Sequence, residues 1–246
     1  MIGYLYDLHT HTRETSKCAY VSAALTVERY HKNGFAGLVV TDHLHPEYLS
    51  GVDTDHDWQK VMDLFLAGYK AAKKRGDELD FDVILGVELR FPENDNDYLV
   101  YGIDENWLRS NPYVCCMSAQ AFYDKFHNEV LIIHAHPLRN GSAPVQETAV
   151  HGAEIINGNP HHQNHNDLAW ELCCRHPAYL RTAGSDAHED GDEARAGVAL
   201  PERVKDSCQF KRMLETKQFR VWGPEFQEFV DMDEARRREE GTALML

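Results

Sequence analysis

Five short apolar segments of this chain each run into histidine or acidic side chains, and this recurrence constrains the fold more than any other feature. The polar side chains are His9 and His11, Asp42 and His43, Glu88, His134 and His136, and Asp186 and His188. Each apolar segment has the length and composition of a buried strand. Since strand ends meet at one face of an α/β barrel, we expect these side chains to converge there.

The segments between these strands predict a single α/β domain over residues 1–246. Strand, polar loop and helix recur with periods of roughly 25–45 residues, as βα units require. Within this pattern the spacing predicts one helix over Trp58–Arg75 and one strand over Phe81–Leu89. A charge-rich tail from about residue 231 predicts a solvated terminal helix. No linker-like or low-complexity segment divides the chain.

Charge and cysteine content restrict the partners and the compartment. The formal net charge of −15 argues against long nucleic acid, which attracts clustered Lys and Arg. A small anionic substrate stays compatible, because bound metal ions can dominate the field of a pocket. The six cysteines show no C-x-x-C spacing, so a zinc knuckle is not expected. Without a signal peptide or bilayer-spanning segment, we expect a cytoplasmic protein with no membrane partner; the oligomeric state is left open.

The side-chain types at the strand ends favour a metal centre. Imidazole together with carboxylate suits Zn, Mn or Fe, and a shared carboxylate such as Glu88 suits a site with more than one ion. On a strand, His9 and His11 project to the same side, so both can reach one ion. A lone His-x-His is weak evidence, and the other four strand ends strengthen it.

Five motifs in order resemble the polymerase and histidinol phosphatase (PHP) family. They are DLHTHT at 7–12, TDH at 41–43, GVE at 86–88, AHPLR at 135–139 and GSDAH at 184–188. The resemblance runs from the first strand to about residue 200. It implies a single-domain, distorted TIM-like (β/α)7 barrel that holds two or three divalent transition-metal ions (Zn, Mn or Fe) and hydrolyses phosphoesters.

The resemblance also implies the ligands of these ions. They are His9, His11, His43, Glu88, His136, Asp186 and His188. Glu88 is expected to bridge the first ion to a second one that His136 also binds. His43 and His188 are expected to serve a third ion.

Two further carboxylates and the catalytic roles follow from the same resemblance. Asp7 is expected to orient a ligand imidazole. Asp42 is likewise expected to hold the ligands in place without binding an ion itself. A water activated between the ions that share Glu88 is expected to attack phosphorus. Either Asp186 or His188 is expected to protonate the leaving group.

The chain departs from the family pattern at two places. Residues 16–18 read Ser-Lys-Cys where family members with a full third site place His or Asp. Either Cys18 substitutes as a thiolate, or Lys17 turns inward and contacts phosphate in place of an ion. The additional histidine that many members supply to the second ion has no clear counterpart, and Asp97 and His134 are the candidates.

Other basic side chains are candidates for binding the substrate phosphate. Arg139 and Arg195 follow two of the strand ends, and Lys17 follows the first. Guanidinium groups suit the free oxygens of a phosphate held at metal ions. The three histidines within residues 161–165 favour capping or solvated roles, with substrate contact as the second interpretation.

The sequence therefore predicts a metal-dependent phosphatase that acts on a small phosphomonoester. One alternative is a nuclease or an oligonucleotide or nucleotide phosphatase, since the family includes both. A second alternative is a catalytically decayed metal-binding scaffold. The acidic composition disfavours the first for long substrates, and the nearly complete ligand set disfavours the second.

Overall fold

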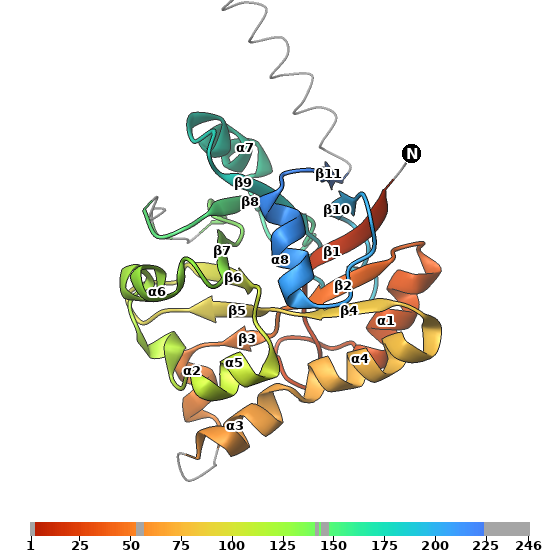
Figure 1. The fold of residues 1–246 in the computed structure, drawn as a ribbon, viewed down its shortest axis with the longest axis horizontal. Coiled ribbons are helices and arrows are strands. Elements are labelled where there is room, and N and C mark those ends of the chain that lie inside the picture. The colour runs from red at the N-terminus through yellow and green to blue at the C-terminus, as the bar shows by residue number, and fades with distance from the viewer. Residues whose placement is uncertain (1–2, 53–56, 141–142, 144–147, 224–246) are drawn as a thin grey trace, which may run out of the picture.

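The structure is a computed structural model that describes residues 3–52, 57–140, 143 and 148–223, and strands alternate with helices along most of it (Figure 1). The strands are β1 (Tyr4–Thr10), β2 (Gly37–Val40), β3 (His43–Leu44), β4 (Asp82–Leu85), β5 (Val87–Arg90), β6 (Asp97–Tyr101), β7 (Leu131–His134), β8 (Gly152–Asn157), β9 (Leu180–Gly184), β10 (Gly197–Leu200) and β11 (Arg220–Trp222). The helices are α1 (Ala23–Lys32), α2 (Pro46–Ser50), α3 (Trp58–Phe65), α4 (Ala67–Leu79), α5 (Glu105–Ser110), α6 (Ala119–Phe126), α7 (Asn166–Arg175) and α8 (Ser207–Glu215), with a 3-10 turn at Val114–Cys116. The predicted tail helix from about residue 231 lies outside the described residues.

The α/β class is confirmed, but the strands described here form two sheets and no closed barrel. The sheet orders are β11-β10-β1-β2-β4 and β3-β5-β6-β7-β8-β9. β6 runs antiparallel to both β5 and β7, and β10 runs antiparallel to β1. The reason for the first reversal is local: residues 91–96 are too few for the crossover that parallel neighbours need.

The two sheets meet at two places. Thr10, at the end of β1, forms a parallel bridge with Ala187, just after β9. On the other side β4 passes directly into β5 through Gly86, so the single strand predicted over residues 81–89 is divided between the sheets. A Cβ atom at Gly86 would lie 2.8 Å from Val39 Cγ1, and glycine permits this close passage.

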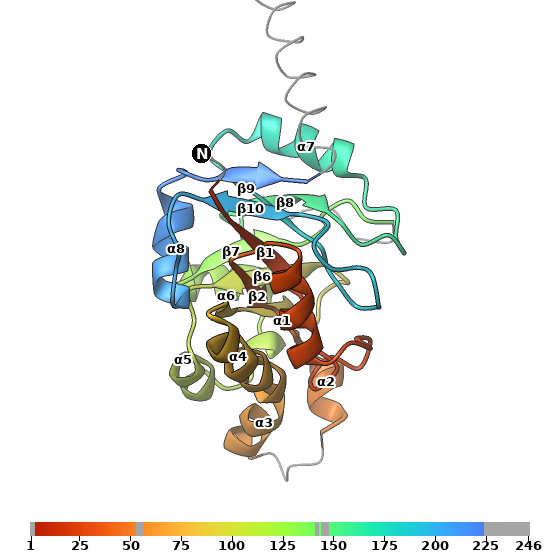
Figure 2. The same ribbon diagram turned by 90° about the vertical axis from the view of Figure 1, so that its right-hand side faces the viewer.

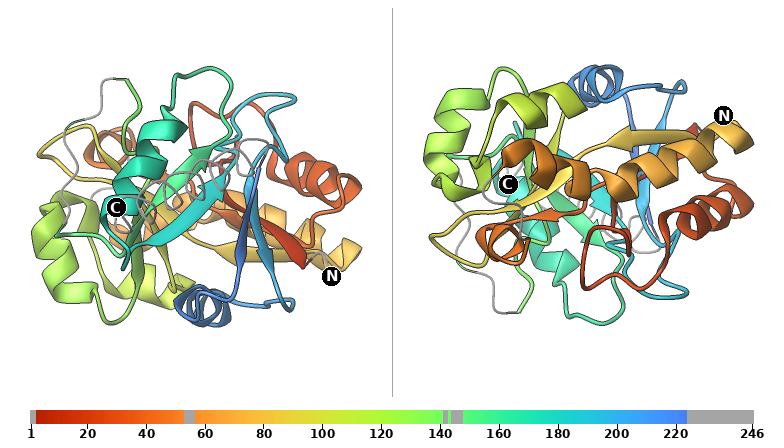
Figure 3. Two further views of the ribbon diagram at one scale, coloured as in Figure 1. Left: turned by 90° about the horizontal axis from the view of Figure 1, so that it is seen from above. Right: turned by 90° about the horizontal axis from the view of Figure 1, so that it is seen from below.

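Helices cover the outer faces of the sheets. α1 and α4 pack side by side against β2 and β4, and α7 packs on β8 (Figures 2 and 3). The helix predicted over residues 58–75 is broken at Leu66 into α3 and α4. The hydroxyl of Thr15 donates to the carbonyl of Phe65 and accepts from the amide of Gly68, so it is inserted at the break. No helix among the described residues has the length and apolarity needed to cross a membrane.

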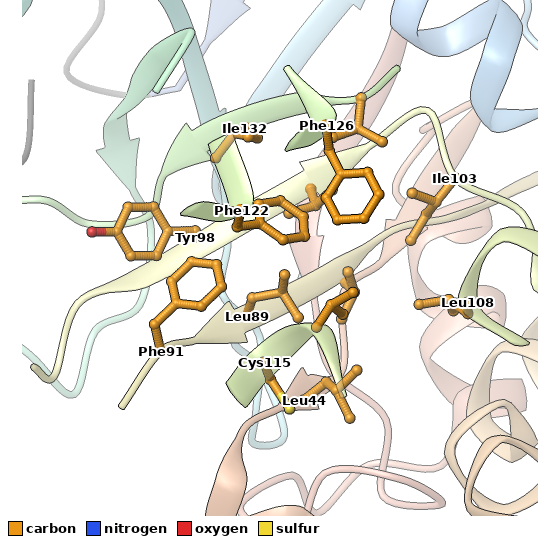
Figure 4. Close-up of a cluster of buried hydrophobic side chains, with 14 of the residues drawn as sticks. Leu44, Leu89, Phe91, Tyr98, Ile103, Leu108, Cys115, Phe122, Phe126 and Ile132 are labelled. Atoms are coloured by element: carbon orange, nitrogen blue, oxygen red, sulfur yellow. The ribbon is translucent and has the colours of Figure 1, made fainter. Parts of the chain in front are cut away.

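The largest apolar cluster lies between β5–β7 and the α5–α6 segment (Figure 4). The ring of Phe91 packs against the rings of Tyr98 and Phe122, with centroids 5.3 and 5.4 Å away, respectively. Leu89 and Ile132 fill the same cluster from β5 and β7. This packing fixes β5 and β7, which carry or precede two of the predicted metal ligands.

A buried charge network at the start of β4 gives a testable contribution to stability. Asp82, 5% exposed, accepts hydrogen bonds from Tyr6 Oη (2.5 Å), Arg203 Nε (2.8 Å) and Lys205 Nζ (2.9 Å). Burial alone would raise the pKa of this carboxyl, but Arg203, Tyr6 and Lys205 hold it below its ordinary value. Its stabilising effect is therefore fully present above the unfolded-state pKa of 3.8 and is lost as pH falls from there through the lower pKa of the folded state.

Replacing Asp82 with Asn should lower the free energy of unfolding at pH 7 by about 2 kcal/mol. The difference from the wild type should shrink below about pH 4, as the wild-type carboxyl also becomes protonated. Urea unfolding at pH 7 and pH 3 measures both values. Asp80→Asn removes a neighbouring, exposed carboxylate and should change stability by less than about 0.5 kcal/mol. An undiminished difference at pH 3 would contradict the assigned charge network.

Candidate metal centre

Four predicted ligands from three strand ends face one another in what we call the first group: His9, His11, Glu88 and Asp186. The Nε2 atoms of His9 and His11 lie 3.3 Å from the two carboxylate oxygens of Glu88. The same nitrogens lie 3.4 and 3.2 Å from Asp186 Oδ1. Ligand atoms bound tetrahedrally at about 2.1 Å from one zinc ion would be separated by about 3.4 Å. The spacing therefore suits a single shared cation.

Unsatisfied polar atoms in the first group support the fit. His9 Nε2 and His11 Nε2 are buried and have no hydrogen-bond partner within the described part of the chain. Such orphaned atoms are rare in folded proteins, because each one carries a desolvation cost. A divalent ion would satisfy both at once, so the residues fit the metal that the motifs predicted.

The electrostatics of the first group keep its carboxylates ionised. Burial would raise the pKa of Asp186 and of Glu88, but His9 and other basic groups around them hold both well below the ordinary range. Burial lowers the pKa of His11 well below its usual value, so this ring is neutral and its lone pair is available. Against burial, Asp186, Glu88 and Glu154 hold the pKa of His9 well above its usual range, so metal binding would displace a proton there.

Glu88 also belongs to a second group, with His136 and Asp97. Its Oε1 atom lies 3.2 Å from His136 Nε2, and that nitrogen lies 3.9 Å from Asp97 Oδ2. Glu88 thus stands between two sets of ligand atoms, the position that a bridging carboxylate requires. His136 (φ 29°) and Asp186 (φ 52°) both have left-handed backbone, which is costly for side chains of this kind and is concentrated at functional sites.

A third group contains His43, His188 and Cys18, with His11 beside them. The ring centroid of His11 lies 4.4 Å from that of His43 and 4.2 Å from that of His188, and one nitrogen of each ring lies within 4.8 Å of the others. Cys18 hydrogen-bonds to His188 and His43, and although burial would raise its pKa, these rings lower it to about 6. Cys18 therefore lies at the position where a His or Asp ligand of the expected third ion is missing from this sequence.

The carboxylate that faces a ligand imidazole is Glu154, which the motifs did not single out. Its oxygens lie 3.1 Å from His9 Nδ1 and accept from the backbone amide of His136 at 2.9 Å. This contact directs His9 Nε2 toward the first group and anchors a ligand of the second. The sequence feature that could have pointed to Glu154 is its charge, since it lies within the otherwise mostly apolar strand β8 (Gly152–Asn157).

Asp7 has a different place from the one that the resemblance implied. It accepts hydrogen bonds from the backbone amides of His9 and Ser185 at 3.0 Å, from the Ser185 hydroxyl, and from Tyr30 Oη at 2.7 Å. These partners are backbone and hydroxyl groups, with no imidazole ring among the described ones. Asp7 therefore ties the segment that carries His9 to the segment that carries Asp186.

Asp42 supports the ligands through Ser16. It accepts from Ser16 Oγ at 2.7 Å and from Thr12 Oγ1 at 2.6 Å. Ser16 Oγ in turn accepts from the His43 amide (3.1 Å) and lies 3.5 Å from His11 Nδ1. Asp42 is thereby connected to His43 and His11 through Ser16.

Of the basic candidates, only Arg139 lies against the metal ligands. Its guanidinium donates to Asp186 Oδ2 (2.5 Å), Asn157 Oδ1 (3.0 Å) and Asn164 Oδ1 (2.9 Å), and these contacts leave Nη1 without a described partner. Arg195 is exposed and donates to the carbonyl of Gly191 instead.

Two further candidates are directed away from the ligands. Lys17 is exposed, and its Nζ would lie 2.7 Å from a Cβ atom built on Gly51, beside the end of α2. His134 is buried on the face of β7 that carries Ile132, and its ring stacks on Tyr98 at 5.1 Å. Burial lowers the pKa of His134 to about 3, so it is a neutral core side chain.

A cavity of about 360 Å³ opens over the three groups. Cys18, His43, His136, Arg139, Asp186 and His188 line it. Arg90 and His162 line it as well, so one of the three histidines of residues 161–165 does face the site. The volume is at the lower end for small-molecule sites.

Replacing Glu154 with Gln should weaken metal binding about tenfold to a hundredfold, because the negative charge behind His9 is lost while the side-chain shape is kept. Competition with a chromophoric chelator measures the affinity. Thr182→Val is the matched control: Thr182 pairs with Glu154 across β8 and β9, and its buried hydroxyl contacts no candidate ligand. Equal affinities of the wild type and Glu154→Gln would remove Glu154 from the metal centre.

The fold of this chain is similar to the folds of several solved structures. No family model matches the sequence, and no curated protein is detectably similar to it. A two-domain protein from Bacteroides vulgatus ATCC 8482, which contains a predicted PHP-like metal-dependent phosphoesterase, superposes with a TM-score of 0.64 at 17% identity over 89% of this chain. This chain spans 64% of that protein.

Two other solved structures are similar over nearly their whole length. PsfC from Pseudomonas syringae PB-5123 has a TM-score of 0.60 at 14% identity, with 97% of this chain and 99% of that one covered. An amidohydrolase from Chromobacterium violaceum, with bound sulfate and no metal, has a TM-score of 0.52 at 14% identity, with 89% and 98% covered. At these identities the likeness shows the fold, which this chain shares with a protein that contains a predicted PHP-like metal-dependent phosphoesterase.

Proposed function

We propose that this chain is a metal-dependent phosphatase that hydrolyses a small phosphomonoester. The observation that carries the proposal is the position of Glu88 between two sets of ligand atoms, with the guanidinium of Arg139 on the neighbouring ligand Asp186. His9, His11, Glu88 and Asp186 would hold the first ion, and Glu88 and His136 the second. Bound divalent ions supply charge neutralisation and an activated water for the attack on phosphorus.

The side chains around the ions have separate tasks in this scheme. The free Nη1 group of Arg139 binds an oxygen of the phosphoryl group, while Asn157 and Asn164 hold the guanidinium in place. Asp186, whose pKa is held well below the ordinary range, carries no proton to give to a leaving group. Of the two proton donors considered from the sequence, His188 is the better one when the third group holds no ion.

The size and charge of the site support a small monoester as substrate. A cavity of about 360 Å³ is too small to enclose more than a small molecule. The net charge of −15 argues against extended nucleic acid, although a mononucleotide is compatible with both observations. Six free thiols support a reducing compartment such as the cytoplasm.

Hydrolysis of a panel of phosphate esters tests this function, measured as phosphate release from monoesters, p-nitrophenolate release from the diester and shortening of the oligonucleotide. The protein, stripped with a chelator and reloaded with Zn, Mn or Fe(II), is assayed with alkyl phosphomonoesters, mononucleotides, bis(p-nitrophenyl) phosphate and a single-stranded oligonucleotide. We expect turnover of monoesters in a metal-dependent manner. Cleavage of the diester and oligonucleotide without monoester turnover would favour the nuclease alternative. No turnover with any ester or ion would favour the decayed scaffold.

The third group makes a spectroscopic prediction. Cobalt(II) bound there should show a near-ultraviolet thiolate charge-transfer band from Cys18, and Cys18→Ser should lose that band and bind fewer ions per chain. Cys208→Ser, which removes an exposed thiol on α8, should keep both. A band that persists in Cys18→Ser would exclude Cys18 as a ligand. In that case Lys17→Met would test whether Lys17 serves the phosphate.

A further inference from the structure

Arg90 presents a second guanidinium to the cavity, apart from the metal ligands. It follows Glu88 by two residues on β5, so both side chains leave the same face of the strand. Its Nε and Nη2 atoms donate to the two oxygens of Asp97 at 2.8 and 2.7 Å. This paired contact leaves Nη1 without a partner among the described residues, while the side chain lines the cavity.

The two cavity arginines lie at different depths. The side chain of Arg139 is 16% exposed and contacts the metal ligand Asp186 directly. The side chain of Arg90 is 36% exposed, and it pairs at the edge of the second group with Asp97, whose Oδ2 lies 3.9 Å from His136 Nε2. Arg139 is therefore the inner cation and Arg90 the outer one.

A single phosphoryl group does not need both arginines. Its three non-bridging oxygens are served by the ions and by Arg139, which stands beside them. The outer Arg90 faces the part of the cavity where the rest of the substrate must lie. Because a guanidinium held by a carboxylate in a fixed orientation recognises oxyanions, its free edge suits a further acidic group.

We infer that the substrate carries a second anionic group, a carboxylate or another phosphate, and that Arg90 binds it. This inference rests on the proposed phosphatase function and narrows its substrate to small phosphorylated acids or bisphosphates. Asp97 positions the guanidinium of Arg90. Because the cavity holds only a small molecule, both anionic groups must belong to one small substrate. Asp95, which also lines the cavity, opposes such binding by its charge.

Three substrates with the same three-carbon chain test the inference: 3-hydroxypropyl phosphate, 3-phosphooxypropanoate and propane-1,3-diyl bisphosphate. In the wild type, kcat/KM for the two diacids should exceed that for the alcohol about tenfold to a hundredfold. Arg90→Gln should reduce this ratio to near one, and Asp95→Asn should increase it. Because the ratio is taken within one enzyme, a general loss of metal or fold cancels. Arg195→Gln removes an exposed guanidinium outside the cavity and should keep the wild-type ratio.

Binding of non-hydrolysable analogues separates this inference from the proposed function. Calorimetry with propylphosphonate and 3-phosphonopropanoate measures the same preference even where no ester is turned over. A preference that depends on Arg90 would support the second anion site, whatever the outcome of the assays. Equal affinities in the wild type, or an Arg90→Gln variant that weakens both phosphonates equally, would overturn it. The kcat/KM values for 3-phosphooxypropanoate and propane-1,3-diyl bisphosphate show whether a carboxylate or a phosphate is the preferred second anionic group.

Discussion

Glu88→Gln should lower kcat by about a thousandfold or more at saturating metal, with little change in the fold. Glu88 is buried, ionised and placed within 3.2–3.3 Å of His9, His11 and His136. The amide keeps the shape of the side chain but removes the charge that two ions would share. Steady-state kinetics and elemental analysis measure the two effects, and circular dichroism checks the fold.

The surface variant Glu78→Gln provides the matched control for Glu88→Gln. Glu78 is exposed on α4 and pairs with Arg75, so its loss should leave turnover and metal content as in the wild type. Normal turnover of Glu88→Gln at saturating metal would show that catalysis does not depend on two metal ions that share this carboxylate. A variant that binds its ions normally but has lost activity would assign Glu88 a role other than bridging.

Arg139→Gln should lower kcat/KM by about a hundredfold, the second-largest effect that we expect. The guanidinium contacts Asp186, Asn157 and Asn164, and it offers its remaining edge to the phosphoryl oxygens. Arg139→Lys should restore little, because an ammonium group cannot reproduce this planar set of contacts. Arg195→Gln should have no such effect. If Arg139→Lys were fully active, a simple positive charge would suffice at this position.

The side chains at the strand ends could be predicted because their placement is a local property. A strand whose end carries His9 and His11, or that ends just before Asp186, brings these side chains to the sheet edge. Glu88 lies on β5 and faces two groups of ligand atoms, an arrangement that the family resemblance implied.

The residues that sequence reasoning misplaced depend on tertiary contacts. Glu154 lies within β8, and its role follows from the pairing of β8 with its neighbours, which no spacing in the sequence encodes. His134 and His136 are two residues apart and would share one face of a continuous strand. The left-handed backbone at His136 breaks that alternation, so His136 joins the ligands and His134 packs on Tyr98.

The breaks within predicted elements also have tertiary causes. The Thr15 hydroxyl divides the helix predicted over residues 58–75, although Thr15 is about fifty residues away in sequence. The predicted strand is divided at Gly86 because its first half, β4, pairs with β2 in one sheet and its second half, β5, pairs with β3 in the other. Apolar periodicity describes one segment at a time and does not register such contacts.

The metal content of the protein tests the central claim most directly. Chelator-treated protein is dialysed against Zn(II) or Mn(II), freed of loose ions and analysed for metal per chain. The arrangement of the three groups around Glu88 predicts at least two ions per chain in the wild type and a loss of more than one in Glu88→Gln. One ion or none in the wild type, or an unchanged content in Glu88→Gln, would contradict a shared metal centre.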